Sequence, residues 1–210
     1  VFLRNVLGDC IYTDALKGME IALYDIDGQR LEQSAAILEA INKGNGCPAS
    51  IRSYLGAENR RKALSGADFV INAIQVGGYA PCTITDLEIP KKYGLRQTIG
   101  DTLGIGGIMR GLRTIPVMKG ITDDMEELCP NAWLLNYTNP MAIVTGAVLK
   151  SSSIKTIGLC HSVQSCTKNL MDVVGMDCTG VEYKIAGINH QAWLLEGTKD
   201  GRDLYPEIKA

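Results

Sequence analysis

The chain has 210 residues, a formal net charge of −2, 46% hydrophobic residues and 21% charged residues, which is the composition of an ordinary globular protein. Without an excess of basic residues to neutralise phosphates, we expect no nucleic-acid partner. No apolar run reaches the about 18 residues that a membrane helix needs, and the first residues lack the apolar segment of a signal peptide, so we expect no membrane partner.

The predicted elements alternate between short apolar runs and stretches with helical spacing. An amphipathic helix over residues 1–17 comes first, followed by a strand at 20–26 and a helix at 29–42. Further strands are predicted at 51–55, 69–74, 133–136, 155–159, 182–187 and 192–195, and further helices at 58–64, 107–128, 141–149 and 164–174. This alternation predicts an α/β fold with a doubly wound, parallel, Rossmann-like sheet that binds ligands at the carboxyl ends of its strands.

Both ends of the chain indicate a portion of a longer enzyme. The helix at 1–17 has no strand and no G-x-G-x-x-G turn before it, where a dinucleotide-binding fold would begin. New strands begin shortly before residue 210. We therefore predict a Rossmann-like domain at 1–178 that lacks its first strand and glycine-rich loop. Residues 179–210 are predicted to start a truncated α+β domain for catalysis and oligomerisation.

Seven cysteines are spread along the chain without the spacing of a disulfide framework. A domain of this length can bury enough apolar surface to fold without cross-links, so we expect free thiols and a cytoplasmic location. Six cysteines are interpreted as structural or incidental, namely Cys10, Cys47, Cys82, Cys129, Cys166 and Cys178.

Two segments that follow predicted strands carry candidate binding residues. Asp25 ends the strand at 20–26, with Asp27 next to it, and can accept hydrogen bonds from the ribose hydroxyls of NAD; the alternative is an ordinary helix-capping aspartate. The segment Asn136-Tyr137-Thr138-Asn139-Pro140 offers amides that can orient a sugar hydroxyl or a nicotinamide carboxamide. The alternative is turn chemistry, because Asn before Pro commonly starts a turn.

The only two histidines of the chain, His161 and His190, both follow predicted strands, and Cys160 precedes the first of them. A thiolate and an imidazole can hold one metal ion and leave coordination positions open for a substrate. Cys160 and His190 are 30 positions apart, so no local zinc-finger spacing applies. The alternatives are a buried structural thiol and a hydrogen-bonded histidine.

Taken together, these segments resemble glycoside hydrolase family 4, the NAD- and metal-dependent glycosidases. The matching motifs occur in the family's order and cover almost the whole chain: Asp25-Ile26-Asp27 with Arg30-Leu31, Ala67-Asp68-Phe69-Val70, Gln97-Thr98-Ile99-Gly100-Asp101-Thr102, Gly106-Gly107-Ile108-Met109-Arg110, Asn136-Tyr137-Thr138-Asn139-Pro140-Met141, Gly158-Leu159-Cys160-His161-Ser162 and Gly187-Ile188-Asn189-His190. The Cys-His-Ser triplet most resembles the α-galactosidase (melibiase) branch, with the α-glucosidases and α-galacturonidases close to it.

This family is an exception to glycoside hydrolysis by two carboxylates. The resemblance implies that NAD takes a hydride from C3 of the sugar, and that the ketone so formed acidifies the proton on C2. A divalent metal ion bound to the C2 and C3 oxygens then stabilises the enediolate that a base generates. A general acid protonates the leaving group at C1, water adds to the unsaturated ketone, and the hydride returns.

Carried over residue by residue, the resemblance implies that Cys160 and His190 are metal ligands. It implies substrate binding by Asn139, Arg110 and Arg113, and cofactor binding by Asp25, Asp27, Gly77, Gly78 and Asn136. His161 follows the cysteine where relatives with Cys-Asp have a proposed acid, so we expect it to act as a general acid or to contact a sugar hydroxyl. The family's tyrosine base is expected beyond residue 210, and no residue of this chain is assigned to that role.

We therefore expect an α-galactosidase that hydrolyses α-linked galactosides with NAD and Mn²⁺ and assembles as a homodimer or homotetramer. An α-glucosidase or α-galacturonidase of the same family is the nearest alternative. An NAD-dependent hydroxy-acid dehydrogenase and an inactive, truncated NAD- or metal-binding domain are the other two. Thiolate and imidazole favour zinc over manganese by affinity, so manganese follows from the resemblance alone.

Overall fold

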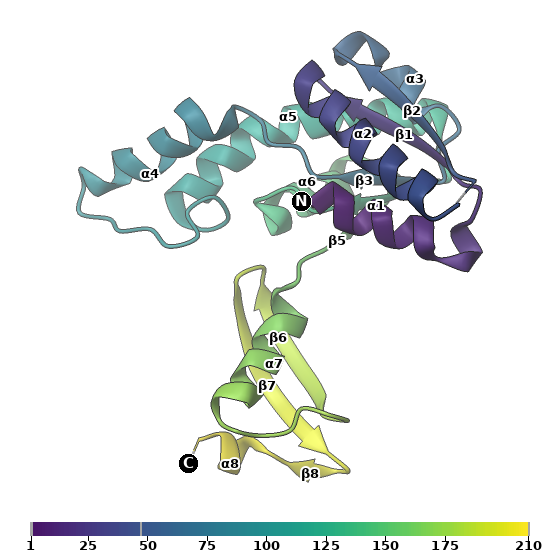
Figure 1. Ribbon diagram of the computed structural model, residues 1–210. Coiled ribbons are helices and arrows are strands. Elements are labelled where there is room, and N and C mark those ends of the chain that lie inside the picture. Colours follow the sequence, from purple (N-terminus) through teal and green to yellow (C-terminus); the bar gives the residue numbers. More distant parts are fainter. Residues whose placement is uncertain (1, 47, 210) are drawn as a thin grey trace. The chain divides into compact units, whose positions relative to one another are not determined.

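The computed structural model describes residues 2–46 and 48–209. Val1, Cys47 and Ala210 lie outside the described residues, so the interpretation of Cys47 stays a prediction. Strands alternate with helices along most of the chain, and two groups of strands are parallel, which confirms the predicted Rossmann-like α/β class (Figure 1). None of the described helices is both long and apolar enough to cross a membrane.

The chain forms two compact units, Val1–Asp68 with Asp123–Ala132 and Phe69–Thr122 with Trp133–Ala210. The first unit contains a pair of parallel strands, β1 and β2, which are paired in register from Glu20↔Ser50 to Asp25↔Leu55. Its elements are α1 (Phe2–Tyr12), η1 (Asp14–Leu16), β1 (Glu20–Asp25), α2 (Gly28–Gly44), β2 (Ser50–Leu55), η2 (Ala57–Asn59) and α3 (Arg60–Leu64).

One face of the β1–β2 pair carries the apolar core of the first unit. Ile21 and Leu23 alternate along β1, so they point to the same side of the strand. They pack with side chains of α1 and α2, and Figure 1 shows these two helices alongside the strands. The core cluster consists of Ile11, Ile21, Leu23, Leu31 and Leu38. Each of these buried side chains contributes about 1.5–3 kcal/mol. Asp25 is two residues beyond Leu23, so its side chain lies on the same face of β1 as Ile21 and Leu23, the face against which α2 packs.

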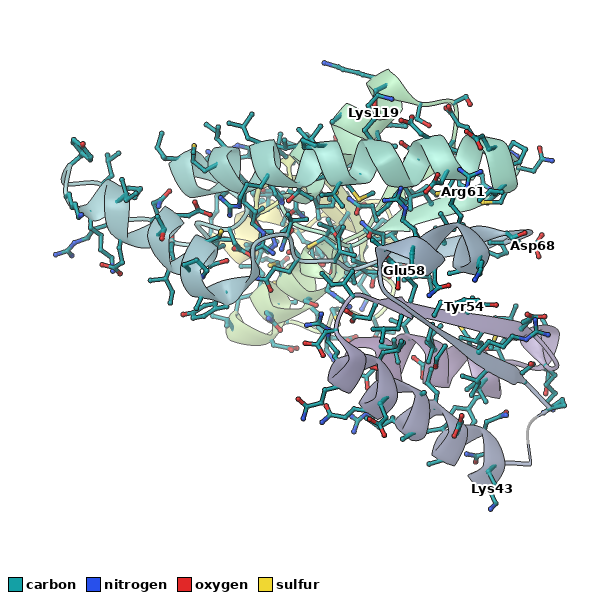
Figure 2. All side chains as sticks on the ribbon, turned by 90° about the horizontal axis from the view of Figure 1, so that it is seen from above. Lys43, Tyr54, Glu58, Arg61, Asp68 and Lys119 are labelled. Carbon is teal, nitrogen blue, oxygen red and sulfur yellow. The ribbon has the colours of Figure 1, made fainter. Side chains whose placement is uncertain are left out.

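Arginines of α3 hold the end of the long helix α5 (Gly104–Leu128) within the first unit. Arg60 and Arg61 donate to opposite oxygens of Asp124 at 2.7 and 2.6 Å, and Figure 2 labels Arg61 on α3. Burial would raise the pKa of Asp124, but the hydrogen bonds from both arginines outweigh it and lower the pKa. The paired guanidinium groups offset the cost of burying this carboxylate.

The second unit contains a three-stranded parallel sheet in the order β3-β4-β5. Asn72 pairs with Asn136, and Asn136 pairs with Gly158, so the three strands end at the same edge. The remaining elements are β3 (Phe69–Asn72), η3 (Gly78–Thr83), α4 (Ile84–Lys91), β4 (Trp133–Asn136), α6 (Met141–Ser151), β5 (Lys155–Gly158), α7 (Ser162–Val173), β6 (Glu182–Ile188), β7 (Gln191–Lys199), β8 (Arg202–Asp203) and α8 (Tyr205–Ile208).

The last strands of the second unit form a separate antiparallel sheet in the order β6-β7-β8. Ile188 of β6 pairs with Gln191 of β7, which leaves Asn189 and His190 as a two-residue turn. β7 extends to Lys199, beyond the predicted end at 195, because its ladder with β6 continues after the apolar pattern stops. The change from parallel to antiparallel strands confirms that a second kind of fold begins near the end of the chain.

Candidate active site

Five of the eleven predicted site residues lie on the segments that leave the carboxyl edge of the β3-β4-β5 sheet. Gly77 and Gly78 follow β3, Asn139 follows β4, and Cys160 follows β5. Parallel strands bring these segments to one edge because each strand must return by a helix before the next begins. The sheet therefore assembles residues that are far apart in the sequence, at the place where α/β folds bind ligands.

Cys160 and His190 come together across 30 positions of sequence. The Sγ atom of Cys160 lies 3.6 Å from Nε2 of His190. Burial raises the pKa of the Cys160 thiol, but hydrogen bonds from the Ser162 side chain and amide, the Asn189 side chain and the His161 amide outweigh it and lower the pKa. The cysteine is therefore held in surroundings that favour the thiolate, which is the form that ligates metal ions.

Ser162 makes two of the contacts that surround this sulfur. Its hydroxyl lies 2.9 Å from the Cys160 Sγ, and its amide donates to the same atom at 3.4 Å. Asn189 lies next to His190, and its Oδ1 is buried without a hydrogen-bond partner among the residues described. No role was predicted for Ser162 or Asn189, although their places in the Cys-His-Ser and Asn-His motifs could have indicated a role beside the two ligand candidates.

The turn that carries His190 has a constrained backbone. His190 has a φ of 62°, in the left-handed region that non-glycine residues rarely adopt. A Cβ atom at Gly187 would lie 2.5 Å from the Ala192 Cα on the opposite strand, so only glycine fits there. The hairpin thus fixes the backbone from which the His190 side chain projects, and constrained backbone of this kind is frequent at functional sites.

His161 lies at the boundary between β5 and α7, where it occupies the N-cap position without a side-chain capping bond. Its side chain is exposed, and its ring centroid lies 6.2 Å from that of Tyr137, with the rings tilted by 34°. Tyr137 follows β4, so this contact joins two neighbouring strand ends. An exposed imidazole in this position can exchange protons with a bound molecule.

Asn136, predicted to contact the cofactor, is fully buried and hydrogen-bonded inside the fold. Its Oδ1 accepts from Asn72 Nδ2 at 2.8 Å and from the Thr138 amide at 3.1 Å, and its Nδ2 donates to Thr145 Oγ1 at 3.0 Å. These bonds fix the turn that follows β4. The geometry favours the turn-forming role for this side chain, and its contact with a cofactor stays a prediction.

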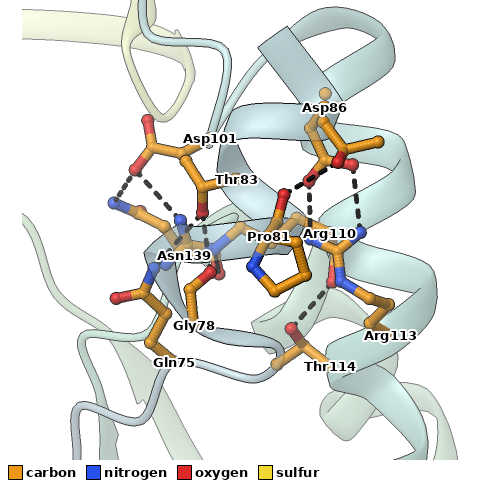
Figure 3. Close-up of polar contacts among 12 residues, drawn as sticks. Gln75, Gly78, Pro81, Thr83, Asp86, Asp101, Arg110, Arg113, Thr114 and Asn139 are labelled. Atoms are coloured by element: carbon orange, nitrogen blue, oxygen red, sulfur yellow. Dashed lines mark hydrogen bonds and ion pairs between the residues drawn. The ribbon is translucent and has the colours of Figure 1, made fainter. Parts of the chain in front are cut away.

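Arg110 and Asn139, predicted to bind substrate, lie against one another (Figure 3). Arg110 Nε donates to the Asn139 carbonyl at 3.1 Å, and Arg110 Nη1 lies 3.6 Å from Asp101 Oδ2. The Asn139 Nδ2 lies 3.5 Å from the same oxygen. Asp101 therefore joins the two predicted residues. It was part of a recognised motif, but nothing in the sequence indicated this contact.

Arg113 is held by a two-point ion pair rather than left open. Its Nη1 and Nη2 donate to the Asp86 carboxylate at 3.0 and 2.5 Å (Figure 3). The pairing raises the pKa of Arg113 against the effect of burial. A Cβ at Gly77 would lie 2.6 Å from Cys82 Sγ and 3.2 Å from Arg113 Nε, and Gly77 has a φ of 85°. Gly77 is thus required by its surroundings, while a sugar contact by Arg113 stays a prediction.

The predicted ribose-binding residues lie in the first unit, at the carboxyl end of β1. Asp27 is the N-cap of α2, because its Oδ1 accepts from the Arg30 amide at 2.9 Å. The Asp25 carboxylate accepts from Arg30 Nε at 2.6 Å and from Arg30 Nη2 at 2.7 Å. Hydrogen bonds from Arg30 lower the pKa of Asp25 against the effect of burial. Arg30 belongs to the motif quoted with Asp25, but its ion pair with Asp25 was not predicted.

Comparison with known proteins gives one family for both parts of the chain. A model of family 4 glycosyl hydrolases matches residues 1–176, and a model of the family 4 glycosyl hydrolase C-terminal domain matches residues 185–210. The chain is 62% identical over 209 residues to an alpha-galactosidase of Bacillus subtilis (strain 168), an alignment that covers 100% of this chain and 48% of that protein.

Two more distant relatives extend the comparison. The chain is 34% identical over 213 residues to an alpha-glucosidase of Erwinia rhapontici, covering 100% of this chain and 46% of that protein. The crystal structure of a 6-phospho-alpha-glucosidase from gut microorganisms, in complex with NAD and Mn²⁺, has the same fold, with a TM-score of 0.85 and 22% identity over 99% of this chain and 46% of that chain. The chain spans about half the length of the curated relatives it matches.

Proposed function

Because the chain belongs to family 4 of the glycosyl hydrolases, we propose that it is the cofactor- and metal-binding portion of an α-galactosidase that hydrolyses α-linked galactosides. The observation that carries the proposal is the approach of Cys160 Sγ to within 3.6 Å of His190 Nε2 at the end of the parallel sheet. The 62% identity to an alpha-galactosidase supports galactose as the sugar, and an α-glucosidase or α-galacturonidase is the nearest alternative.

The chain is divided, in this proposal, into a dinucleotide-binding domain at 1–178 and the start of a C-terminal catalytic domain at 179–210. The two family models support this division, since one ends at residue 176 and the other begins at residue 185. The antiparallel sheet also begins in this region, at Glu182 of β6. The two compact units divide the chain at other residues.

The metal site of the proposal is formed by Cys160 and His190. The described residues hold no group of three or more His, Cys, Asp or Glu side chains suited to a metal, so two protein ligands leave several positions for substrate oxygens. The hydrogen bonds that lower the Cys160 pKa favour the ligating thiolate. Manganese is proposed from the family, and the Mn²⁺ in a relative of the same fold supports it.

The NAD site of the proposal draws on Asp25, Asp27, Gly77, Gly78 and Asn136. Gly78, with a φ of 66°, has open space where a Cβ atom would lie, so the chain after β3 allows a close approach by a ligand at this residue, next to Gly77. NAD bound to a relative of the same fold supports the cofactor. When bound, NAD supplies a reversible hydride acceptor and the metal ion a Lewis acid for sugar oxygens.

The chain's own side chains orient the sugar and move a proton. Asn139 and Arg110 offer amide and guanidinium donors that lie together and are joined by Asp101. Arg113 supports the same helix through its ion pair with Asp86. His161 is exposed beside Tyr137 and donates a proton to the leaving oxygen at C1 or a hydrogen bond to a sugar hydroxyl.

The requirement for cofactors tests this function directly. The natural protein that carries this sequence is expected to cleave an α-galactoside only with NAD, Mn²⁺ and a reducing agent that keeps Cys160 as a free thiol. Release of the sugar is measured before and after NAD is stripped and EDTA is added. Full hydrolysis under those stripped conditions would exclude the redox-assisted mechanism.

Two rival functions give different results in simple measurements. A hydroxy-acid dehydrogenase accumulates NADH in proportion to product, whereas the glycosidase returns the hydride and shows no net NADH absorbance. A binding domain without activity is separated by calorimetry of the 210-residue chain with NAD and Mn²⁺ combined with an activity assay. Binding without turnover by the natural protein would favour the inactive binding domain.

The location and assembly of the enzyme are also part of the proposal. The described cysteines are free thiols, which supports a reducing, cytoplasmic compartment. We place no nucleic acid or membrane among its partners, and we propose a homodimer or homotetramer. Light scattering of the natural protein measures its mass, and a monomer at micromolar concentration would contradict the assembly.

A further inference from the structure

The ion pair between Asp25 and Arg30 occupies the position at which a dinucleotide-binding fold recognises the ribose. Asp25 ends β1, and its side chain is 24% exposed, whereas the Arg30 side chain is 61% exposed. A carboxylate at this point selects the ribose hydroxyls of NAD, and an arginine nearby accommodates the 2′-phosphate of NADP. This chain has both groups within hydrogen-bonding distance of each other.

Local hydrogen bonds fix the geometry of the pair. Arg30 donates through Nε and Nη2 to opposite oxygens of Asp25, which is a bidentate arrangement. The Asp27 amide also donates to Asp25 Oδ1 at 3.0 Å, while the Asp27 side chain accepts from the Arg30 amide. The first turn of α2 and the end of β1 are thereby joined beside the ion pair.

The guanidinium nevertheless keeps donors that are not used within the fold. Across residues 2–46 and 48–209, Nη1 of Arg30 makes no hydrogen bond to another described residue. Its exposure leaves this edge accessible to a bound molecule. The fork of N–H groups that pairs with a carboxylate pairs equally well with a phosphate. Asp25 and a 2′-phosphate would therefore compete for the same side chain.

We propose that Arg30 determines the choice between NAD and NADP, and that Asp25 holds it in the NAD-selecting state. This rests on the proposed function, because it assumes that a nicotinamide dinucleotide binds at the end of β1. Engaged with Arg30, Asp25 has one lone pair left, on Oδ2, which it presents to a ribose hydroxyl, and its charge repels a 2′-phosphate. Released from Asp25, Arg30 binds that phosphate. Without Arg30, no guanidinium remains at this point to bind that phosphate.

A double-mutant cycle tests the proposal by binding rather than by activity. Dissociation constants for NAD and NADP are measured by calorimetry on the natural protein and on Asp25→Ser, Arg30→Gln and the double variant. We expect Asp25→Ser to shift the ratio of affinities toward NADP by about a hundredfold, and Arg30→Gln to shift it toward NAD by about tenfold. When Arg30→Gln is already present, Asp25→Ser should have a smaller effect, because no guanidinium is left for it to release.

Controls separate this inference from the proposed function. Arg52→Gln removes a comparable exposed ion pair with Glu20 at the other end of β1, and it should leave the ratio unchanged. Asp25→Asn keeps the side-chain shape if Asp25→Ser is poorly folded. An equal effect of Asp25→Ser with and without Arg30→Gln would overturn the role of Arg30 while leaving the NAD site intact. Absence of NAD binding by the unaltered protein would overturn the proposed function itself.

Discussion

Two polar clusters lie at the same edge of the β3-β4-β5 sheet, and they differ in how their hydrogen bonds are used. Around Asn136, side chains are buried and donors meet acceptors inside the fold. Around Cys160, the sulfur lies 3.6 Å from an exposed imidazole, and Asn189 Oδ1 has no partner among the described residues. A satisfied cluster stabilises the fold. The cluster around Cys160 has a polar atom without a partner among the described residues and a His190 in the left-handed backbone conformation. These are features of a site that binds a ligand.

Replacing Cys160 by Ser tests the second cluster with the largest expected effect. The variant loses the thiolate ligand, so metal-dependent hydrolysis should fall by more than about 100-fold, since even changes behind the ligands cost up to that much. Activity is measured over a Mn²⁺ titration, and circular dichroism checks the fold. Cys166→Ser, at an exposed thiol on α7, is the matched control and should keep full activity. Near-normal rates in Cys160→Ser would remove Cys160 from the metal site.

Replacing Asn136 by Ala tests the satisfied cluster. The change leaves Asn72 Nδ2 and the Thr138 amide without the oxygen that they share, so the free energy of unfolding should fall by about 2–3 kcal/mol. Urea denaturation measures this loss. Asn139→Ala, a few residues on, should change stability by less than about 0.5 kcal/mol because its side chain is only half-buried. Equal stabilities for the two variants would show that the buried hydrogen bonds of Asn136 do not stabilise the fold.

A smaller effect is expected from Ser162→Ala. The hydroxyl and Cys160 Sγ are 2.9 Å apart, so its loss removes support from the proposed ligand without removing the ligand. Affinity for Mn²⁺, measured by calorimetry, should weaken by about tenfold. Ser165→Ala, on the exposed part of α7, provides the comparison. An unchanged affinity in Ser162→Ala would show that the sulfur needs no such support.

The smallest effect concerns the backbone at His190. Asn tolerates the left-handed conformation with φ of 62°, so His190→Asn should change the free energy of unfolding by less than about 0.5 kcal/mol while it removes the imidazole. His190→Val places a β-branched residue in that conformation and should cost about 1–3 kcal/mol. Thermal unfolding compares the two variants. A larger loss in the Asn variant than in the Val variant would assign the ring a structural role.

The sequence by itself determined the order of the elements and the places where chemistry could occur. Apolar periodicity is a local property, so the strands at 20–26, 133–136 and 155–159 were predicted within one residue of β1, β4 and β5. Because these strands pair in parallel, the segments that follow them lie at the carboxyl edges of the sheets. The alternation of strands and helices in the sequence had predicted this arrangement. Cys160 and His190 became candidates because they lie beside strand ends, and the resemblance to glycoside hydrolase family 4 implied that they are partners; the structure places them 3.6 Å apart.

Only the tertiary structure decided which polar atoms were already occupied. Asn72 meets Asn136 across 64 positions, and Arg113 meets Asp86 across 27, and no local pattern encodes such pairs. Asp25 and Arg30 are five positions apart, yet their pairing depends on how the end of β1 meets the first turn of α2. Hydrogen bonds require atoms at defined distances and angles. Residue types therefore predicted where the site lies, and packing decided which of its groups hold the fold and which remain open to a ligand.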